Sequence, residues 1–143
     1  MPSFVDQLIL HEGLRLKPYA DTVGKLTIGV GRNLTDRGIT REESLYLLDN
    51  DITRVTREVK LALPWFDGLD PVRRKVVLDM SFNMGTGIAG VSGLLAFTNT
   101  LRAMKEGRYV DASHGMLASL WAAQTKTRAT RLAKMMETGQ DYT

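Results

Sequence analysis

Two carboxylates near the N-terminus, Glu12 and Asp21, could serve as a pair for acid catalysis. Glu12 follows Leu8 and Ile9 at helical spacing, so it extends an apolar face, where desolvation would raise the pKa of its carboxyl. A carboxylic acid that stays protonated near neutral pH can donate its proton to a leaving oxygen. Asp21 lies in a turn, where aspartate is also common for structural reasons. Residue type and position alone leave a solvated glutamate and a turn aspartate as alternatives.

The elements expected to hold these carboxylates are a short helix and a hairpin. Ser3 and Asp6 predict the capped start of a helix over residues 3–12, which ends at Gly13. From Leu16 the pattern changes to a hairpin followed by a glycine-interrupted strand that includes Thr27. The segment 36–38 reads as a turn.

The rest of the chain predicts helices. Thr40 and Glu43 form a capping box that opens a long helix, which the segment 64–68 interrupts. Asp70 and Pro71 predict the N-cap and first residue of another helix. The glycines between residues 85 and 93 predict a loop or short helical pieces, and further helices are expected over 94–106, 109–120 and 127–138. The fold class is therefore α+β: a small N-terminal hairpin lobe and a larger all-helical C-terminal lobe, joined by a long helix.

Composition narrows the classes of site. Of the 143 residues, 43% are hydrophobic and 24% are charged, as in an ordinary globular domain. There is no cysteine and the two histidines are isolated in the sequence, so we expect no metal site. Residues 1–70 contain 9 basic and 11 acidic side chains, whereas residues 71–143 contain 10 and 5. A basic half attracts polyanions, although it could equally be a solvated surface.

The N-terminal residues carry Asp6 and lack a basic segment followed by a long apolar run. We therefore expect no export signal and no stable membrane insertion. The product is expected to remain in the cytoplasm, and to need another route to any target outside it.

A dense motif covers residues 12–31. It reads Glu-Gly, then Tyr-x-Asp, then Gly-x-x-Thr-Ile-Gly-x-Gly, and it closely resembles the signature of the phage-type lysozymes, glycoside hydrolase family 24. The segments 70–74, 82–85, 97–101 and 121–139 resemble later elements of that family. The segment 34–38 is shorter than in the longest members.

This resemblance implies one lysozyme-like catalytic domain over residues 1–143, with lobes of about 13–60 and 61–143 plus the helix 3–12. It implies that Glu12 is the general acid, that Asp21 is the second acidic residue and that Thr27 helps to hold the attacking water. Such enzymes cleave the β-1,4 bond between N-acetylmuramic acid and N-acetylglucosamine in peptidoglycan, without metal or cofactor.

The resemblance also implies supporting residues. Arg128 matches a basic residue that reaches back toward the catalytic glutamate. Tyr19, Phe82 and Asn83 could line the sugar cleft, and Gly31 could allow the backbone to approach the sugar or allow the sheet to bend. We expect a monomer that acts on peptidoglycan in host lysis, that binds no nucleic acid, and that reaches the wall of the periplasm from the host cytoplasm with a holin-type partner.

The chain departs from the family at Arg32, where familiar members have a histidine that pairs with an acid on the long helix. We expect Asp49 to be the partner of Arg32, with Asp51 as the second choice. Such a pair would concern stability more than activity.

Three alternatives stay open at this stage. The first is a wall-binding module that kept the fold and lost its activity. The second is a nucleic-acid-binding helical protein, suggested only by the basic half of the chain. The third is a lytic transglycosylase, which forms an anhydro sugar on a related fold but needs no water-holding partner such as Asp21 with Thr27.

Overall fold

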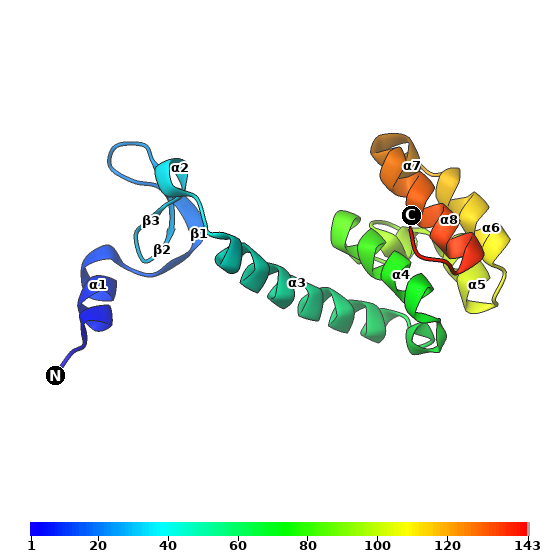
Figure 1. Cartoon of the computed structure of the whole chain (residues 1–143), viewed down its shortest axis with the longest axis horizontal. Coiled ribbons are helices and arrows are strands. Elements are labelled where there is room, and N and C mark those ends of the chain that lie inside the picture. Colours follow the sequence, from blue (N-terminus) through cyan, green and yellow to red (C-terminus); the bar gives the residue numbers. More distant parts are fainter. Residues whose placement is uncertain (143) are drawn as a thin grey trace. The chain divides into compact units, whose positions relative to one another are not determined.

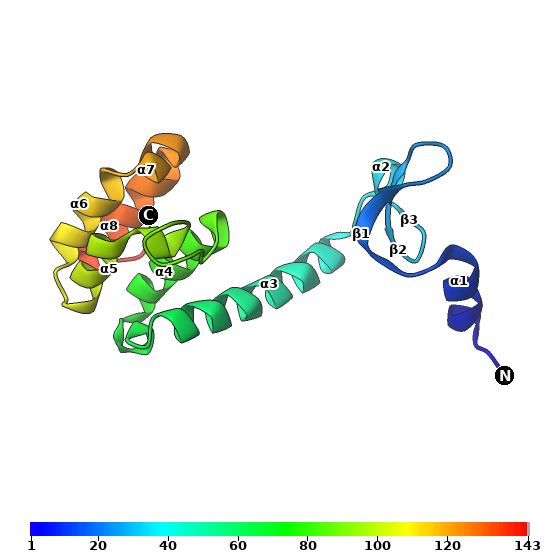
Figure 2. The same ribbon diagram turned by 180° about the vertical axis from the view of Figure 1, so that it is seen from behind.

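The computed structural model describes residues 1–142, and the chain folds as two compact units, Met1–Leu48 and Asp49–Thr143. The boundary between the units falls inside the long helix α3, Arg41–Ala62. The lobe boundary expected from the sequence, near residue 60, lies at the end of the same helix. Figure 1 labels the elements in chain order, and Figure 2 shows them from behind.

The first unit contains a short helix, a small sheet and a single helical turn. Its elements are α1 (Phe4–Glu12), β1 (Arg15–Ala20), β2 (Leu26–Gly29), β3 (Arg32–Asn33) and α2 (Leu34–Arg37), followed by the start of α3. The strands pair in the order β1-β2-β3, and both pairings are antiparallel. The predicted hairpin is confirmed as β1 and β2. The glycine-interrupted strand that includes Thr27 ends at Gly29, and β3 was not predicted.

Helix α1 begins at the expected cap. The Ser3 hydroxyl accepts the N–H of Asp6, and the Asp6 carboxylate accepts the N–H of Ser3. This reciprocal pairing satisfies donors that a helix start would leave unpaired. Within its unit α1 buries none of its side chains, so the apolar face that includes Leu8 and Ile9 is partly exposed.

The segment that we expected to be a simple turn at residues 36–38 contributes instead to a one-turn helix, α2. The Asn33 side chain accepts the N–H of Asp36, which caps the start of the turn, and Gly38 ends it with its N–H bonded to the carbonyl of Leu34. The sequence signal was the asparagine three residues before Asp36, a spacing typical of an N-cap.

The capping box at the start of α3 is confirmed. The N–H of Glu43 donates to the Thr40 hydroxyl at 3.1 Å, and the N–H of Thr40 donates to the Glu43 carboxylate at 2.9 Å. The helix ends at Ala62, two residues before Pro64, which cannot donate a backbone hydrogen bond.

The second unit contains helices joined by loops and has no strand among its described residues. After α3 it contains η1 (Phe66–Gly68), α4 (Pro71–Met84), η2 (Leu94–Ala96), α5 (Thr98–Lys105), α6 (Tyr109–Leu117), α7 (Leu120–Thr125) and α8 (Thr127–Thr138). Helices α5, α6 and α8 lie side by side in both views (Figures 1 and 2). The Asp70 N-cap and Pro71 at the first turn of α4 are confirmed.

The helices expected over 94–106 and 109–120 are each divided in the structure. Phe97 leaves helical geometry, so the first segment becomes η2 and α5. Ser119 caps a new helix by accepting the N–H of Ala122, so α6 ends at Leu117 and α7 begins at Leu120. The sequence pattern of apolar residues continues across both breaks, which is why periodicity alone did not locate them.

The core of the second unit is rich in methionine. Its largest fully buried side chains include Met80, Leu94, Met104, Met116 and Met136, which come from α4, η2, α5, α6 and α8. Flexible methionines fill irregular gaps between short helices that meet at different angles. No helix among the described residues combines the length and the apolar character that crossing a membrane requires.

Candidate active site

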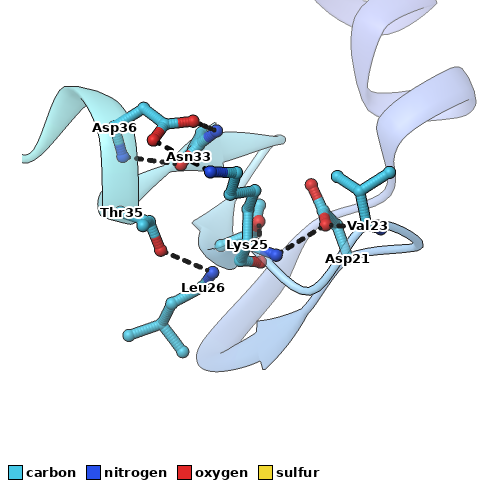
Figure 3. Close-up of polar contacts among 8 residues, drawn as sticks. Asp21, Val23, Lys25, Leu26, Asn33, Thr35 and Asp36 are labelled. Carbon is cyan, nitrogen blue, oxygen red and sulfur yellow. Dashed lines mark hydrogen bonds and ion pairs between the residues drawn. The ribbon is translucent and has the colours of Figure 1, made fainter.

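Asp21 closes the turn between β1 and β2 with its own backbone and side chain. Its N–H donates to the carbonyl of Lys25 at 2.9 Å, and its carbonyl accepts the N–H of Gly24 at 3.0 Å. Its carboxylate oxygen Oδ1 accepts the N–H of Val23 at 2.9 Å and the N–H of Lys25 at 2.8 Å (Figure 3). The turn therefore fixes the orientation of the carboxylate through one oxygen.

Thr27 follows on β2 and is buried, with 4% of its surface exposed. Its hydroxyl donates to the carbonyl of Lys25 at 2.9 Å, the same carbonyl that accepts the N–H of Asp21. In the sheet Thr27 pairs with Tyr19 on β1 and with Asn33 on β3. The structure thus brings Asp21 and Thr27 together around the backbone of Lys25.

Glu12 ends α1, and its carboxylate lies against Gly31 at the turn between β2 and β3. A Cβ atom built on Gly31 would lie 2.8 Å from Oε2 of Glu12 and 3.0 Å from its Cδ. Gly31 also has a φ of +67°, a region that L side chains rarely adopt. The backbone therefore favours glycine here, and a Cβ at this position would displace the Glu12 carboxylate.

The burial that we expected for Glu12 is not found within the first unit, where its side chain is exposed. The physical reason is that α1 packs no apolar side chain into a core of that unit. Its carboxylate lies next to Gly31.

Tyr19, a predicted sugar-contacting residue, is half-buried on β1. The guanidinium of Arg15 lies over its ring, 4.2 Å from the centroid. This cation–π contact holds the ring against the strand. A sugar contact for Tyr19 stays a prediction.

The predicted partner of Arg32 is wrong: Arg32 pairs with Glu43, and neither Asp49 nor Asp51 pairs with it. Both guanidinium nitrogens take part, with Nη1 at 2.8 Å from Oε1 and Nη2 at 2.7 Å from Oε2. The Arg32 guanidinium, together with the backbone N–H of Thr40, lowers the pKa of Glu43 from its usual 4.5 to about 2. Glu43 was not predicted as the partner of Arg32 because its role in the capping box already explained an acidic residue at this position.

Three candidate residues belong to the second unit. The Phe82 side chain is 45% exposed. The Asn83 amide oxygen accepts the indole N–H of Trp121 at 2.9 Å. Arg128 contacts Asp79 through Nε at 2.8 Å and Nη2 at 2.7 Å. Asn83 and Arg128 therefore have structural partners within their own unit, and their predicted roles toward sugar and Glu12 stay predictions.

The hollow on the first unit is not lined by the candidate catalytic residues. A hollow of about 660 Å³ lies between Ile28–Arg32 and the segment 39–47, over the Arg32–Glu43 pair, and its lining includes none of Glu12, Asp21 and Thr27. The hydrogen bonds around Asp21 and Thr27, and not a pocket, therefore define the candidate site.

Two residues of α2 that were not predicted from the sequence support the Asp21 turn. Thr35 accepts the backbone N–H of Leu26 at 2.9 Å, and Asp36 accepts the Lys25 ammonium at 3.2 Å (Figure 3). The signal that could have found them was the cap at Asn33, which predicts that the residues after it turn back toward β2.

Comparison with known proteins gives one family and several relatives. The family model described as phage lysozyme matches residues 10–134. The probable T4-type lysozyme 1 of Dictyostelium discoideum is 28% identical over an alignment that covers 96% of this chain and 95% of that protein. The probable T4-type lysozyme 2 of the same organism is 26% identical with the same coverage.

A third relative is much longer. The pre-baseplate central spike protein Gp5 of Enterobacteria phage T4 is 32% identical over 96% of this chain, and the alignment spans 28% of the spike protein. The family match includes the whole segment from Glu12 to Gly31, so the hairpin, its turn and the end of α1 are all part of the shared region. This chain belongs to the phage lysozyme family and is a glycoside hydrolase that degrades peptidoglycan.

Proposed function

We propose that this lysozyme hydrolyses the β-1,4 bond between N-acetylmuramic acid and N-acetylglucosamine, with Glu12 as the general acid and with Asp21 and Thr27 holding the attacking water. The observation that carries the proposal is the shared attachment of Asp21 and Thr27 to the backbone of Lys25. Two oxygen-bearing side chains held in this way can bind one water in a fixed orientation.

The hydrogen bonds of the pair suit a water molecule. Both backbone donors reach Oδ1 of Asp21, which leaves Oδ2 able to accept a hydrogen from water. The Thr27 hydroxyl uses its hydrogen on the Lys25 carbonyl, so toward water it acts as an acceptor. A water that donates to both oxygens would keep a lone pair directed at the anomeric carbon.

The proposed reaction is an inverting displacement. Glu12 donates its proton to the glycosidic oxygen as the bond from that oxygen to the anomeric carbon breaks. The water oxygen forms the new bond to the anomeric carbon, and Asp21 accepts the proton that the water loses. Release of the products leaves Glu12 to regain a proton and Asp21 to lose one.

The positions of the two carboxylates along the hairpin support separate roles. Asp21 lies in the turn next to the Ala20–Leu26 pair, whereas Glu12 contacts Gly31, beyond the Arg15–Gly29 pair at the other end of the ladder. Inverting enzymes keep their carboxyls about 6.5–9.5 Å apart to admit water, whereas retaining enzymes need about 5–5.5 Å. Because Glu12 and Asp21 lie at opposite ends of the β1–β2 pairing, we expect their carboxyls to have the larger of these two separations.

We further propose that Tyr19, Gly31, Phe82 and Asn83 contribute to sugar binding and that Arg128 supports Glu12, as the family resemblance implies. The protein would act as a monomer in host cell lysis. It would accumulate in the host cytoplasm and reach the wall with a holin-type partner.

One of the relatives favours a second biological setting for the enzyme, in the virus particle. The similarity to a segment of a central spike protein suggests a lytic domain that acts from the virion. The two settings differ in where the protein is found: a spike component is present in purified particles, whereas a lysis enzyme is made late in infection and is absent from them. Mass spectrometry of purified particles separates these alternatives.

Digestion of purified peptidoglycan followed by mass spectrometry tests the proposed reaction. Hydrolysis at the proposed bond yields fragments that end in reducing N-acetylmuramic acid. Fragments that end in the anhydro sugar would contradict the water-holding role of Asp21 and Thr27. Fragments with reducing N-acetylglucosamine would contradict the proposed bond.

A further inference from the structure

The backbone of Lys25 is the point through which the two proposed water-holding side chains are fixed. Its N–H donates to the carboxylate of Asp21 at 2.8 Å, and its carbonyl accepts both the Asp21 N–H and the Thr27 hydroxyl, each at 2.9 Å. The Lys25 N–H lies in the Gly24–Lys25 peptide and the Lys25 carbonyl in the Lys25–Leu26 peptide. A shift of the Lys25–Leu26 peptide would therefore displace the Thr27 hydroxyl and the Asp21 backbone that carries the carboxylate.

Helix α2 fastens that peptide from its outer side. The hydroxyl of Thr35 accepts the N–H of Leu26, the residue directly after Lys25, at 2.9 Å. The carboxylate of Asp36 accepts the ammonium of Lys25 at 3.2 Å. Figure 3 shows both contacts, with α2 on one side of the Lys25–Leu26 segment and Asp21 on the other.

The helical turn that supplies these contacts is itself held to the strand that carries Thr27. Asn33 pairs with Thr27 in the sheet, and its side chain caps α2 through the N–H of Asp36 and also donates to the Asp36 carboxylate. The path from Thr27 through Asn33 and α2 to Leu26 therefore closes on itself. Such a closed set of contacts resists displacement of any single member.

We propose that Thr35 is a positioning residue for Asp21 and Thr27, and that the Lys25–Asp36 ion pair assists it. This inference rests on the proposed function of Asp21 and Thr27. Thr35 carries the larger share, because it bonds directly to the backbone of the segment that must be fixed, whereas Asp36 contacts only the end of the Lys25 side chain. The ion pair is 40% exposed at Lys25 and 53% at Asp36, and exposed pairs of this kind hold their partners weakly.

The first test compares Thr35→Val with Thr35→Ser. Valine keeps the shape and removes the acceptor for the Leu26 N–H, whereas serine restores the acceptor. Because a misplacement of about 1 Å can cost about 10²-fold in rate, we expect Thr35→Val to lower kcat by at least about tenfold with little change in KM. Thr35→Ser should keep kcat within about threefold of wild type on the same argument.

The control is Thr53→Val, which removes a threonine hydroxyl that only donates to the Asp49 carbonyl within α3. This variant should keep wild-type kcat. Rates are measured well below the melting temperature of every variant, so that loss of stability alone does not lower the rate. A Thr35→Val protein with wild-type kcat, or one in which serine fails to restore kcat, would overturn the proposal.

A second measurement needs no catalysis. Ionisation of Asp21 should move the amide proton signals of Val23 and Lys25, because both amides donate to its carboxylate. We expect Thr35→Val to reduce the pH-dependent shift of the Lys25 amide and to accelerate its hydrogen exchange, and Thr35→Ser to restore both. An unchanged Lys25 amide in Thr35→Val contradicts the inference even if the enzyme proves to cleave a different bond.

The ion pair is tested by Asp36→Asn at low and high salt. We expect a loss of about twofold to threefold in kcat at low salt that disappears at high salt, because salt screens exposed charges. Asp67→Asn, which removes an exposed pair with Lys60 in the second unit, is the matched control and should leave kcat unchanged at both salts. Equal behaviour of Asp36→Asn and Asp67→Asn would remove the ion pair from the proposal.

Discussion

The carboxylate of Glu12 lies so close to the backbone of Gly31 that a Cβ atom at residue 31 would displace it. A Cβ atom at residue 31 would lie 2.8 Å from Oε2, closer than real Cβ contacts come. Gly31 was expected to let the backbone approach the sugar or to let the sheet bend. It also leaves room for the carboxylate of the proposed general acid. The carboxylate at the end of α1 therefore lies beside the turn after β2.

Gly31→Ala should therefore reduce activity more than stability explains. The positive φ alone costs a non-glycine residue about 1–2 kcal/mol. Displacement of the Glu12 carboxylate should add a loss of up to about 10²-fold in kcat. Turnover of a defined oligosaccharide and chemical denaturation measure the two effects separately.

Gly29→Ala is the matched control for that variant. Gly29 has a φ of +69° but no heavy atom lies within 4 Å of its built Cβ. It should show the same loss of stability with most of its activity retained. Equal losses of activity in the two variants would mean that backbone strain, and not the contact with Glu12, explains the result.

The Arg32–Glu43 pair should stabilise the protein above pH 4.5, lose this effect in acid and leave no transition near neutral pH. The pKa of Glu43 is lowered from 4.5 to about 2 in the folded protein. Its contribution to the free energy of unfolding is therefore fully present above pH 4.5 and is lost as the pH falls toward 2. Thermal melts should show wild type and Glu43→Gln converging as the pH falls through this window.

Asp49→Asn separates the observed pair from the one that the sequence suggested. In the structure both terminal nitrogens of the Arg32 guanidinium pair with Glu43. The melting profile of Asp49→Asn across acid pH should therefore parallel that of wild type. A profile that matches Glu43→Gln instead would return Asp49 to the role of partner.

Asn83 should reveal two separable functions. Asn83→Ala leaves the indole N–H of Trp121, a side chain only 7% exposed, without its acceptor. An unpaired donor of this kind costs about 1–3 kcal/mol, measurable by urea denaturation. Asn83→Asp keeps an acceptor for Trp121 and loses the amide donor, so it should keep more of the stability and raise KM if the amide binds sugar.

The product anomer tests the role of Asp21. An inverting enzyme that acts on a β-linked substrate releases the α anomer first, and NMR of a fresh digest reads it before mutarotation. We expect the α anomer, because Thr27 beside Asp21 is useful for orienting water and has no role in forming a sugar–Asp bond. A β product would identify Asp21 as a nucleophile and remove the water-holding role of Thr27.

Local signals in the sequence predicted much of the fold. Thr40 with Glu43 and Asp70 with Pro71 marked helix starts correctly, because each cap is made by residues three or fewer positions apart. Features that depend on distant partners were not predictable in this way. The pairing of Arg32 with Glu43 follows from how the segment after β3 returns to α3, which no spacing rule specifies.

The candidate site shows the same division. Glu12, Asp21 and Thr27 were recognisable because the motif fixes their types and spacing within a short segment. The exposure of Glu12 within its unit and the support that Thr35 gives to the Asp21 turn could not be recognised from the sequence. Both depend on which side chains α1 and α2 bring to the sheet. The Asn33 cap, a local feature, was the nearest available signal for α2.

The most direct test of the account is the turnover of Glu12→Gln on purified peptidoglycan. Glutamine keeps the size and hydrogen bonding of the side chain beside Gly31 and removes the transferable proton. We expect at least about a 10²-fold loss of activity, in line with the contribution of a general acid, and a circular dichroism spectrum and melting temperature close to those of wild type. A folded Glu12→Gln protein with near-wild-type turnover would contradict the assignment of Glu12 as the acid.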